Sequence, residues 1–353
     1  MKEFKYLQKL FFLLVMGFSL CALQACSSDD DETMDDPSSN TKDIAVTGEV
    51  QSYGCTTADI TGYVNLNQLF PDSKGQIDWG SLAVGGVKFG VEVAPSSGEE
   101  SPRQITSNTL SDDNRTFTAK VDELSLNTEY KYRTFVQYGG IYHYGEHQTF
   151  TTKDLVKSGA VDLGLSVKWA ACNVGASSPQ GYGGYYAWGE TAEKSNYSWE
   201  TYKWSEPKYD RWGNVDSYDW ITKYCTDEYY GNVDNKTTLA LTDDVARVKL
   251  GGSWRMPTKS EFEELIDKCT WVQISYNDVD GRLITGPNGN SIFLPAAGYR
   301  DYTSFNDRGS YGYYCGYYWS ATLEDNDAAF ILSDDDGNWS WRYCGCTVRP
   351  VKK

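Results

Sequence analysis

Apolar and polar side chains alternate along several short stretches between residues 43 and 153. Apolar residues fall on every second position, with one exception, in 58–66, 87–93 and 117–121. Strict alternation indicates half-buried antiparallel strands. A Gly-Gly pair at 139–140 between two aromatic-rich runs predicts a hairpin turn. About seven short strands with no helical stretch between them predict an all-β sandwich over this region.

A helical period appears further along the chain. The segment from Thr258 to Glu261 predicts a capping box, in which the threonine hydroxyl and the glutamate carboxylate each bond the other residue's backbone. Apolar residues then recur at spacings of three and four as Phe262, Leu265, Ile266 and Cys269. We expect an amphipathic helix there, with Cys269 as a small buried hydrophobe. A shorter helix is expected to start at Thr242, because two aspartates favour its first turn.

Aromatic residues are concentrated in the second half of the chain. Eleven of the 12 Trp and 19 of the 27 Tyr follow residue 154. Such side chains bury a large area at low rotamer cost, so we expect a loop-rich but compact fold that does not depend on disulfides. Seven cysteines follow Cys26, and this odd number excludes a complete disulfide framework. A late hairpin is predicted where 330–332 and 339–341 flank an acidic turn.

Composition narrows the classes of function. The 353 residues carry a net charge of −17, which disfavours nucleic-acid partners. The apolar share of 40% excludes a wholly disordered protein.

The first 26 residues have the order of a targeting segment. Lys2, Lys5 and Lys9 precede an apolar run that is too short for a comfortable membrane span. The run ends in Leu-Gln-Ala-Cys26, which resembles the lipobox of bacterial lipoproteins. The resemblance implies a signal peptide over 1–25, an acylated Cys26 and an outer-membrane lipid as partner.

The segment 26–42 continues with six acidic residues, one basic residue and almost nothing apolar. Such a segment cannot fold alone, so we expect a solvated, disordered tether. Its acidic run also resembles the surface-export signal of Bacteroidetes lipoproteins. That resemblance implies a lipid-anchored protein exposed on the cell surface of a Gram-negative bacterium.

Two segments of 43–153 resemble fibronectin type III domains. Leu126-Asn127-Thr128-Glu129-Tyr130 resembles the segment of that family that carries a leucine, a threonine and a tyrosine, in which the tyrosine packs at a corner and bonds back to the backbone. The run 145–152 resembles the last strand of such modules in Bacteroidetes surface proteins. The resemblance implies a fibronectin III-like β-sandwich that acts as a spacer or platform.

Three segments of 155–353 carry a second resemblance, to the Fibrobacter succinogenes major paralogous domain. They are Val161–Ala170, Gly251–Thr258 and Tyr318-Trp319-Ser320 followed by Val348–Val351. That family is related to the C-type lectin-like fold of formylglycine-generating enzymes and of retroelement-diversified variable proteins. The resemblance implies an α+β C-type lectin-like domain, so that the whole chain is multidomain. It does not by itself imply sugar binding.

Catalytic and metal chemistry find little support. His143 and His147, the only histidines, would lie about 13 Å apart on one strand face, too far for one metal. Cys344 and Cys346 could form a copper pair as in the enzyme branch of the fold, but residues two apart bridge only with strain. The acidic turn at 334–337 fails as an EF-hand because Leu332 holds its first ligand position. We therefore expect no enzyme, cofactor or metal.

Surface recognition remains, and 301–346 is rich in the residue types that form antibody-like contact surfaces. The predicted ligand-binding residues are Asp301, Tyr302, Ser304, Asn306, Tyr311, Tyr313, Tyr314, Tyr317, Asn338, Ser340, Tyr343, Cys344 and Cys346. The ligand would be an extracellular protein or, alternatively, a glycan stacked on the rings. Two alternatives stay open: the rings may instead fill a core, and the chain may be a copper-dependent oxidase of the formylglycine-generating type.

The same residue set suggests diversification at adenine-rich codons, as in retroelement-diversified proteins. Gly298, Trp319, Gly345 and Arg349 would then be fixed scaffold positions.

Overall fold

The computed structural model describes residues 43–71, 86–98, 100–111, 115–309, 316–333 and 336–353. The predicted signal peptide 1–25, the lipidated Cys26 and the tether 26–42 lie outside the described residues, as do Tyr311, Tyr313 and Tyr314. None of the described helices has the length and apolar character needed to cross a membrane.

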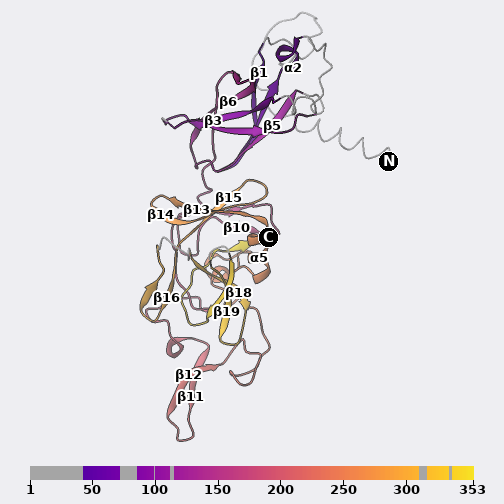
Figure 1. Cartoon of the computed structure of the whole chain (residues 1–353). Helices are drawn as coiled ribbons and strands as arrows, with labels where there is room; N and C mark the ends of the chain where they lie inside the picture. Colours follow the sequence, from indigo (N-terminus) through magenta and orange to yellow (C-terminus); the bar gives the residue numbers. More distant parts are fainter. Residues whose placement is uncertain (1–42, 72–85, 99, 112–114, 310–315, 334–335) are drawn as a thin grey trace, which may run out of the picture. The chain divides into compact units, whose positions relative to one another are not determined.

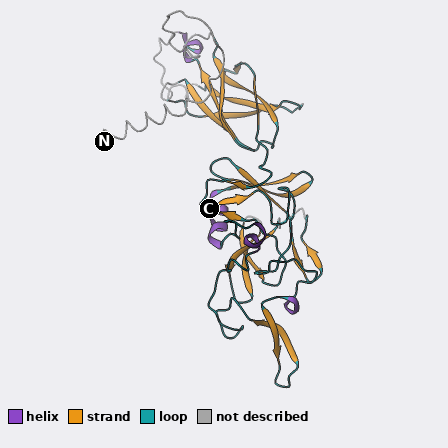
Figure 2. Cartoon of the chain, turned by 180° about the vertical axis from the view of Figure 1, so that it is seen from behind, coloured by secondary structure: helices purple, strands orange, loops and turns teal. Residues whose placement is uncertain are grey.

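Residues 43–153 fold as a β-sandwich of two antiparallel sheets (Figures 1 and 2). One sheet has the order β1-β2-β5, and the other has the order β4-β3-β6-β7, with β8 also paired to β6. The strands are β1 (Ala45–Tyr53), β2 (Ala58–Val64), β3 (Lys88–Pro95), β4 (Arg103–Ser107), β5 (Thr116–Val121), β6 (Glu129–Tyr138), β7 (Ile141–Tyr144) and β8 (Gln148–Thr151). Among the described residues of this region, one short helix, α2 (Leu66–Leu69), departs from the all-β prediction.

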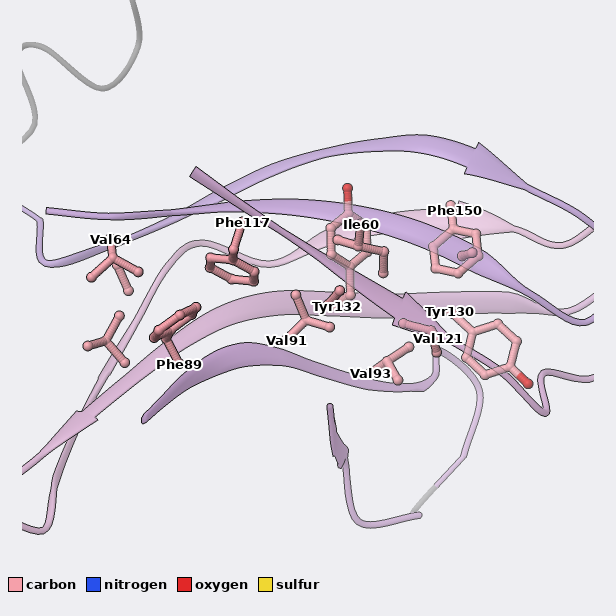
Figure 3. Close-up of a cluster of buried hydrophobic side chains, with 14 of the residues drawn as sticks. Ile60, Val64, Phe89, Val91, Val93, Phe117, Val121, Tyr130, Tyr132 and Phe150 are labelled. Carbon is pink, nitrogen blue, oxygen red and sulfur yellow. The ribbon is translucent and has the colours of Figure 1, made fainter. Parts of the chain in front are cut away.

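The alternation in the sequence places one side of each strand in the core between the sheets. Ile60 of β2 and Phe117 of β5 face Phe89 and Val91 of β3, and all four are buried (Figure 3). The rings of Phe89 and Phe117 lie 5.1 Å apart. The β-sandwich prediction is confirmed.

Tyr130 forms the predicted corner at the start of β6. Its side chain is buried, and its hydroxyl accepts a hydrogen bond from the Ser125 N–H at 2.8 Å. This backward bond to the backbone is the one that a tyrosine corner makes in sandwich domains. Thr128 contributes by donating to the Leu126 carbonyl at 2.8 Å, which fixes the turn that leads into the strand.

Residues 155–353 form a module of small antiparallel sheets, long ordered loops and short helices (Figures 1 and 2). Three sheets have three strands: β9 (Ala160–Val161), β10 (Lys168–Ala170) and β21 (Val351–Lys352); β13 (Thr270–Tyr276), β14 (Val279–Thr285) and β15 (Ser291–Pro295); β18 (Tyr317–Leu323), β19 (Ala328–Ser333) and β20 (Asp336–Trp341). Two hairpins complete the sheets: β11 (Ser205–Tyr209) with β12 (Val215–Ile221), and β16 (Tyr299–Asp301) with β17 (Ser304–Asn306). The helices are the 3₁₀ turn η2 (Trp199–Thr201), α4 (Val245–Leu250) and α5 (Lys259–Lys268).

The predicted helix α5 is present with its capping box. Thr258 Oγ1 accepts from the Glu261 N–H at 3.3 Å, and Glu261 Oε2 accepts from the Thr258 N–H at 2.9 Å. Phe262 is fully buried, with its ring 5.5 Å from that of Trp169. The helix ends at Lys268, so Cys269 caps it and is only partly buried.

The shorter helix begins later than predicted. Its N-cap is Asp244, whose carboxylate accepts from the Arg247 N–H at 3.0 Å, so α4 starts at Val245 rather than at Thr242. Asp243 instead faces Lys223, with 2.5 Å between carboxylate and ammonium.

Large aromatic rings form the centre of the carboxy-terminal module. Trp169, Trp188 and Trp319 are fully buried, and the indole N–H of Trp319 donates to the Tyr186 carbonyl at 2.8 Å. The six cysteines among the described residues are all free. Within the described part of the chain, the prediction of a core built from aromatic side chains is therefore confirmed.

Candidate ligand-recognition surface

The β16–β17 hairpin carries the first group of predicted ligand-binding residues. Its two-residue turn is Tyr302-Thr303, because Asp301 pairs with Ser304 in the register. Tyr302 exchanges two backbone hydrogen bonds of 2.8 Å with Tyr197. Its φ of +49° lies in the left-handed region, which costs a residue other than glycine about 1–2 kcal/mol. The neighbouring structure thus holds Tyr302 in one backbone conformation.

The hairpin is also hydrogen-bonded to a residue that lies 45 positions later in the chain. The backbone N–H of Arg300 donates to the Gly345 carbonyl at 2.7 Å, and the backbone N–H of Gly345 donates to the Arg300 carbonyl at 2.9 Å. A Cβ on Gly345 would lie 2.6 Å from the ring of Tyr197. Gly298, with φ +59°, has the Asn306 carbonyl 2.1 Å from the position of a Cβ. Both glycines are required by this close approach, which makes the hairpin a rigid element.

Four aromatic rings gather at the hairpin. Tyr302 is 58% exposed and Phe305 is 46% exposed. The ring of Tyr343 lies 6.4 Å from that of Tyr302 and 5.0 Å from that of Trp199. We call these four residues (Trp199, Tyr302, Phe305 and Tyr343) the aromatic surface. It offers broad apolar area together with two phenol hydroxyls.

Two arginines alternate with aromatic rings beside this surface. The Arg308 guanidinium lies 4.7 Å from the ring centre of Tyr182 and 4.6 Å from that of Phe305. The Arg300 guanidinium lies 4.7 Å from the ring centre of Phe305 and 5.1 Å from that of Tyr197. Phe305 thus contacts two cations, and these cation–π contacts favour one position of its ring.

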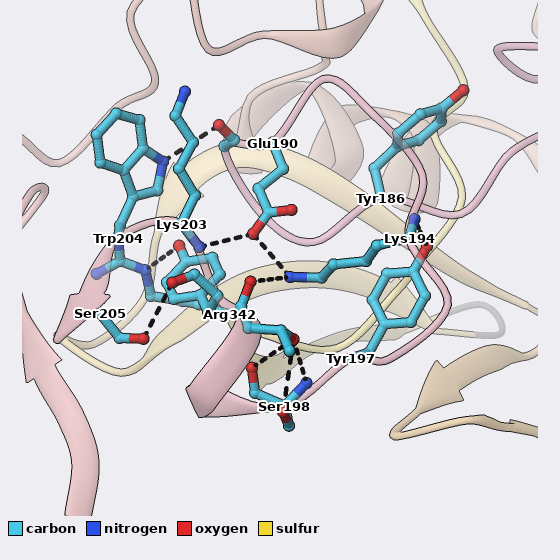
Figure 4. A network of polar contacts seen from close by, with 12 residues as sticks. Tyr186, Glu190, Lys194, Tyr197, Ser198, Lys203, Trp204, Ser205 and Arg342 are labelled. Atoms are coloured by element: carbon cyan, nitrogen blue, oxygen red, sulfur yellow. Dashed lines mark hydrogen bonds and ion pairs between the residues drawn. The ribbon is translucent and has the colours of Figure 1, made fainter. Parts of the chain in front are cut away.

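A polar network supports the surface from below (Figure 4). The Lys194 ammonium donates to Glu190 at 2.8 Å and to the Thr201 carbonyl at 2.9 Å. Burial lowers the pKa of Lys194, while Glu190 opposes that shift. The Tyr197 hydroxyl donates to the Tyr185 carbonyl at 2.5 Å. The segment that contacts Tyr302 is therefore anchored by groups with their partners already satisfied.

The structure brings part of the predicted set together. Asp301, Tyr302, Ser304 and Asn306 share the hairpin, and the ring of Tyr343 lies beside that of Tyr302. Tyr317 lies 4.6 Å from Tyr299, ring to ring, and is only partly exposed. Asn338 is exposed on β20, and Ser340 is partly buried on the same strand.

Cys344 and Cys346 are not on this surface, so their prediction as ligand contacts is wrong. They are 3% and 0% exposed, and both belong to the apolar cluster around Trp188 and Trp319. Burial raises the pKa of Cys344 to about 12 and that of Cys346 well above its usual value. Both thiols are therefore enclosed by apolar side chains rather than presented to a ligand at the surface.

Several exposed rings were missed by the sequence prediction. Trp339 and Trp341 are 50% and 40% exposed on one face of β20, with their rings 5.3 Å apart. Strand alternation through 337–341 could have placed them on one face, since residues two apart point the same way. Trp199 and Arg308 had no such signal, because their neighbours come from distant parts of the sequence.

The aromatic surface presents groups that can make non-covalent contacts with a ligand. Among the described residues, no group of three or more His, Cys, Asp or Glu side chains is placed to hold a metal ion. What the surface does combine is fixed rings, hydroxyls and an exposed guanidinium, which are the groups used in non-covalent recognition.

No family model matches the chain, and no curated protein matches it. Among solved structures, the short form of the sensor domain of the anti-sigma factor RsgI4 from Pseudobacteroides cellulosolvens is 19% identical, over 31% of this chain and 94% of its own, with a TM-score of 0.23. The fibronectin type III domain of human fibronectin type III domain containing protein 3 is 14% identical, over 31% of this chain and 85% of its own, with a TM-score of 0.23. A fibronectin type III domain from the human KIAA0970 protein is 13% identical, over 36% and 88%, with a TM-score of 0.24.

Proposed function

We propose that the chain is a lipid-anchored surface protein that recognises an extracellular ligand with its carboxy-terminal module. In this proposal, acylated Cys26 holds the protein in the outer membrane of a Gram-negative bacterium. The acidic segment 26–42 is a solvated tether, and the sandwich 43–153 is a spacer. Residues 155–353 have the C-type lectin-like fold that their sequence segments resemble, and they carry the binding site.

The rigidity of the aromatic surface is the observation that supports binding best. Two exposed rings, Tyr302 and Phe305, lie on a hairpin whose backbone is hydrogen-bonded to both Tyr197 and Gly345. Rings that are already fixed lose little conformational entropy when a ligand covers them. A tyrosine that served only the core would be buried, whereas Tyr302 is exposed although its backbone is fixed.

A glycan is the second candidate ligand, and the pair Trp339–Trp341 favours it. The two rings are exposed and inclined at 79° to each other. Such a corner presents one ring to the flat face of a sugar while the other ring lines its edge. Sugar rings stack on aromatic side chains through their C–H faces, and indole offers the largest such area.

Retroelement diversification would account for the composition of 301–346. The four scaffold positions are suited to stay constant: Gly298 and Gly345 have no room for a side chain, and Trp319 and Arg349 are fully buried. The gene decides this point. A nearby template repeat that differs from the gene at adenines supports diversification, and the absence of such a repeat contradicts it.

The binding proposal is tested with the chain made soluble by Cys26→Ser and applied to arrays of extracellular proteins and of glycans. We expect the double variant Tyr302→Ala/Phe305→Ala to lose at least tenfold in affinity, as for removal of contact hot spots. A matched control is Tyr209→Ala/Trp212→Ala, which removes two rings that are 61% and 71% exposed on the β11–β12 hairpin. Equal loss in both variants, or loss in neither, would contradict the assignment of the site.

The anchor is tested separately. Cells fed a labelled fatty acid should label the wild-type protein and leave the Cys26→Ser variant unlabelled. Protease added to intact cells should then remove the carboxy-terminal module. Labelling that persists in the variant would overturn the lipoprotein assignment, and protection from protease would overturn surface exposure.

A further inference from the structure

Arg308 differs from the cations around it, which are buried or have bonded partners. Its guanidinium is stacked between the rings of Tyr182 and Phe305, and the residue is exposed. No carboxylate among the described residues lies within ion-pair distance of it. The guanidinium of neighbouring Arg300 instead donates to the carbonyls of Lys194, Ser195 and Thr303.

Stacking determines what the Arg308 guanidinium can do. Two ring centres within 4.7 Å restrict the positions of the guanidinium, while its planar edge of N–H groups makes no side-chain hydrogen bond or ion pair to the described residues. A planar edge of this kind matches the two oxygens of a carboxylate. The side chain loses little entropy on binding because its position is already set by the two rings.

From this we infer that Arg308 is an anion subsite of the aromatic surface, and that it takes the carboxylate of an acidic sugar. The inference rests on the proposed binding function and adds the class of ligand. The carboxylate would meet the Arg308 edge, while the sugar ring lies against Phe305 and Tyr302. The hydroxyl of Thr303, exposed in the turn of the same hairpin, would serve a sugar hydroxyl.

The charge of the whole chain favours an acidic sugar over an acidic protein. With a net charge of −17, the protein repels a partner that carries a dense negative surface. A glycan with single carboxylates separated by neutral polar groups meets much less of this repulsion. Its apolar ring face also uses the exposed rings, which a purely ionic partner would leave uncovered.

The experiment uses the soluble Cys26→Ser chain on an array of sialylated and uronate glycans, each beside its methyl ester. Esterification removes the charge and leaves the rest of the sugar unchanged. We expect the wild-type chain to bind the acid at least tenfold more tightly than the ester. Arg308→Gln should abolish that preference without lowering the affinity for the ester, and Arg308→Lys should restore little of it because ammonium lacks the planar fork.

Arg211→Gln is the matched control. Arg211 is also exposed and lies 4.0 Å from the ring of Trp212, but on the β11–β12 hairpin, so its loss should leave the preference unchanged. Equal binding of acid and ester, a preference that survives Arg308→Gln, or no glycan binding at all would each overturn the anion subsite. Binding of neutral glycans or of a protein that depends on Tyr302 and Phe305 would still support the proposed function.

Discussion

Arg349 shows how this protein buries a positive charge without a carboxylate beside it. The side chain is fully buried, and its guanidinium donates to Asn173 Oδ1 at 2.8 Å and to the carbonyls of Ala170, Ala171 and Phe293 at 2.8–3.1 Å. Burial lowers its pKa to about 10. Arg349 thereby joins the segment before Asn173, strand β15 and the end of the chain.

We predict that Arg349→Lys lowers the free energy of unfolding by roughly 2–4 kcal/mol, because an ammonium cannot reach all of these acceptors and leaves some of them buried without a donor. Urea denaturation followed by tryptophan fluorescence measures the change. The same exchange at exposed Arg308 should cost no more than about 0.5 kcal/mol. Similar effects at the two positions would refute the structural role of Arg349.

The Tyr130 hydroxyl accepts a hydrogen bond that stabilises the fold. We predict that Tyr130→Phe destabilises the protein by about 0.5–1.5 kcal/mol, since the Ser125 N–H at the corner loses its acceptor. The control is Tyr138→Phe at the other end of β6, where the side chain is 38% exposed. If both variants unfold at the same denaturant concentration as the wild type, the corner makes no measurable contribution.

Single residues also mark where sequence reasoning succeeded and where it stopped. Tyr130 could be predicted because its motif is local and its partner is five residues away. The burial of Cys344 and Cys346 could not be predicted. Spacing shows that residues two apart share a face, but not whether that face meets water or the core.

At the scale of elements, helix α5 depends on the Glu261 carboxylate, which makes two separate interactions. Glu261 closes the capping box and also bonds Arg255, with 2.5 Å between Nη2 and Oε1. Burial alone would raise the pKa of Glu261, but the bonds from Arg255 and from the Thr258 backbone lower it below the usual value. The ionised form is therefore the one that the folded protein stabilises.

We predict that Glu261→Gln costs roughly 1–3 kcal/mol at pH 7, through loss of a charge-assisted bond. A folded-state pKa below the unfolded value means that the contribution is complete above about pH 4.3 and is lost as the pH falls through the folded pKa. The gap between variant and wild type should therefore close in acid. Denaturation at several pH values checks this, with exposed Glu263→Gln on the same helix as control; a gap that stays constant to low pH would contradict it.

Elements differ in how far their own sequence specifies them. Helix α5 was predictable because its cap and its apolar stripe lie within a dozen residues. The β16–β17 hairpin was not predicted, since its three-residue strands carry too little periodicity. Its position depends on backbone bonds to Tyr197 and Gly345, which are far away in the sequence.

At the scale of the whole molecule, the sandwich has a core of its own. The buried cluster around Ile60, Phe89 and Phe117 is drawn only from residues 44–150. We predict that a fragment of residues 43–153 folds alone and unfolds in one cooperative transition. Circular dichroism during heating tests this. A fragment without a cooperative transition would show that the core cluster is insufficient.

The candidate surface as a whole was predictable only in part. Residue types in 301–346 pointed to Tyr302 and Tyr343, and the pairing of Arg300 with Gly345 does bring their segments together. Trp199 and Tyr182 come from more than a hundred residues earlier in the chain. Composition can indicate that a region recognises something, but only the tertiary fold shows which distant rings complete it.

At position 302, the residue that best suits the backbone conformation differs from the residue that best suits binding. Glycine would adopt the same turn without steric cost, and asparagine at little cost. Variants selected only for resistance to heat should therefore drift toward these two residues at 302, while variants selected for adhesion should retain the ring. The identity of residue 302 in an evolved population would then reveal which pressure acted on it.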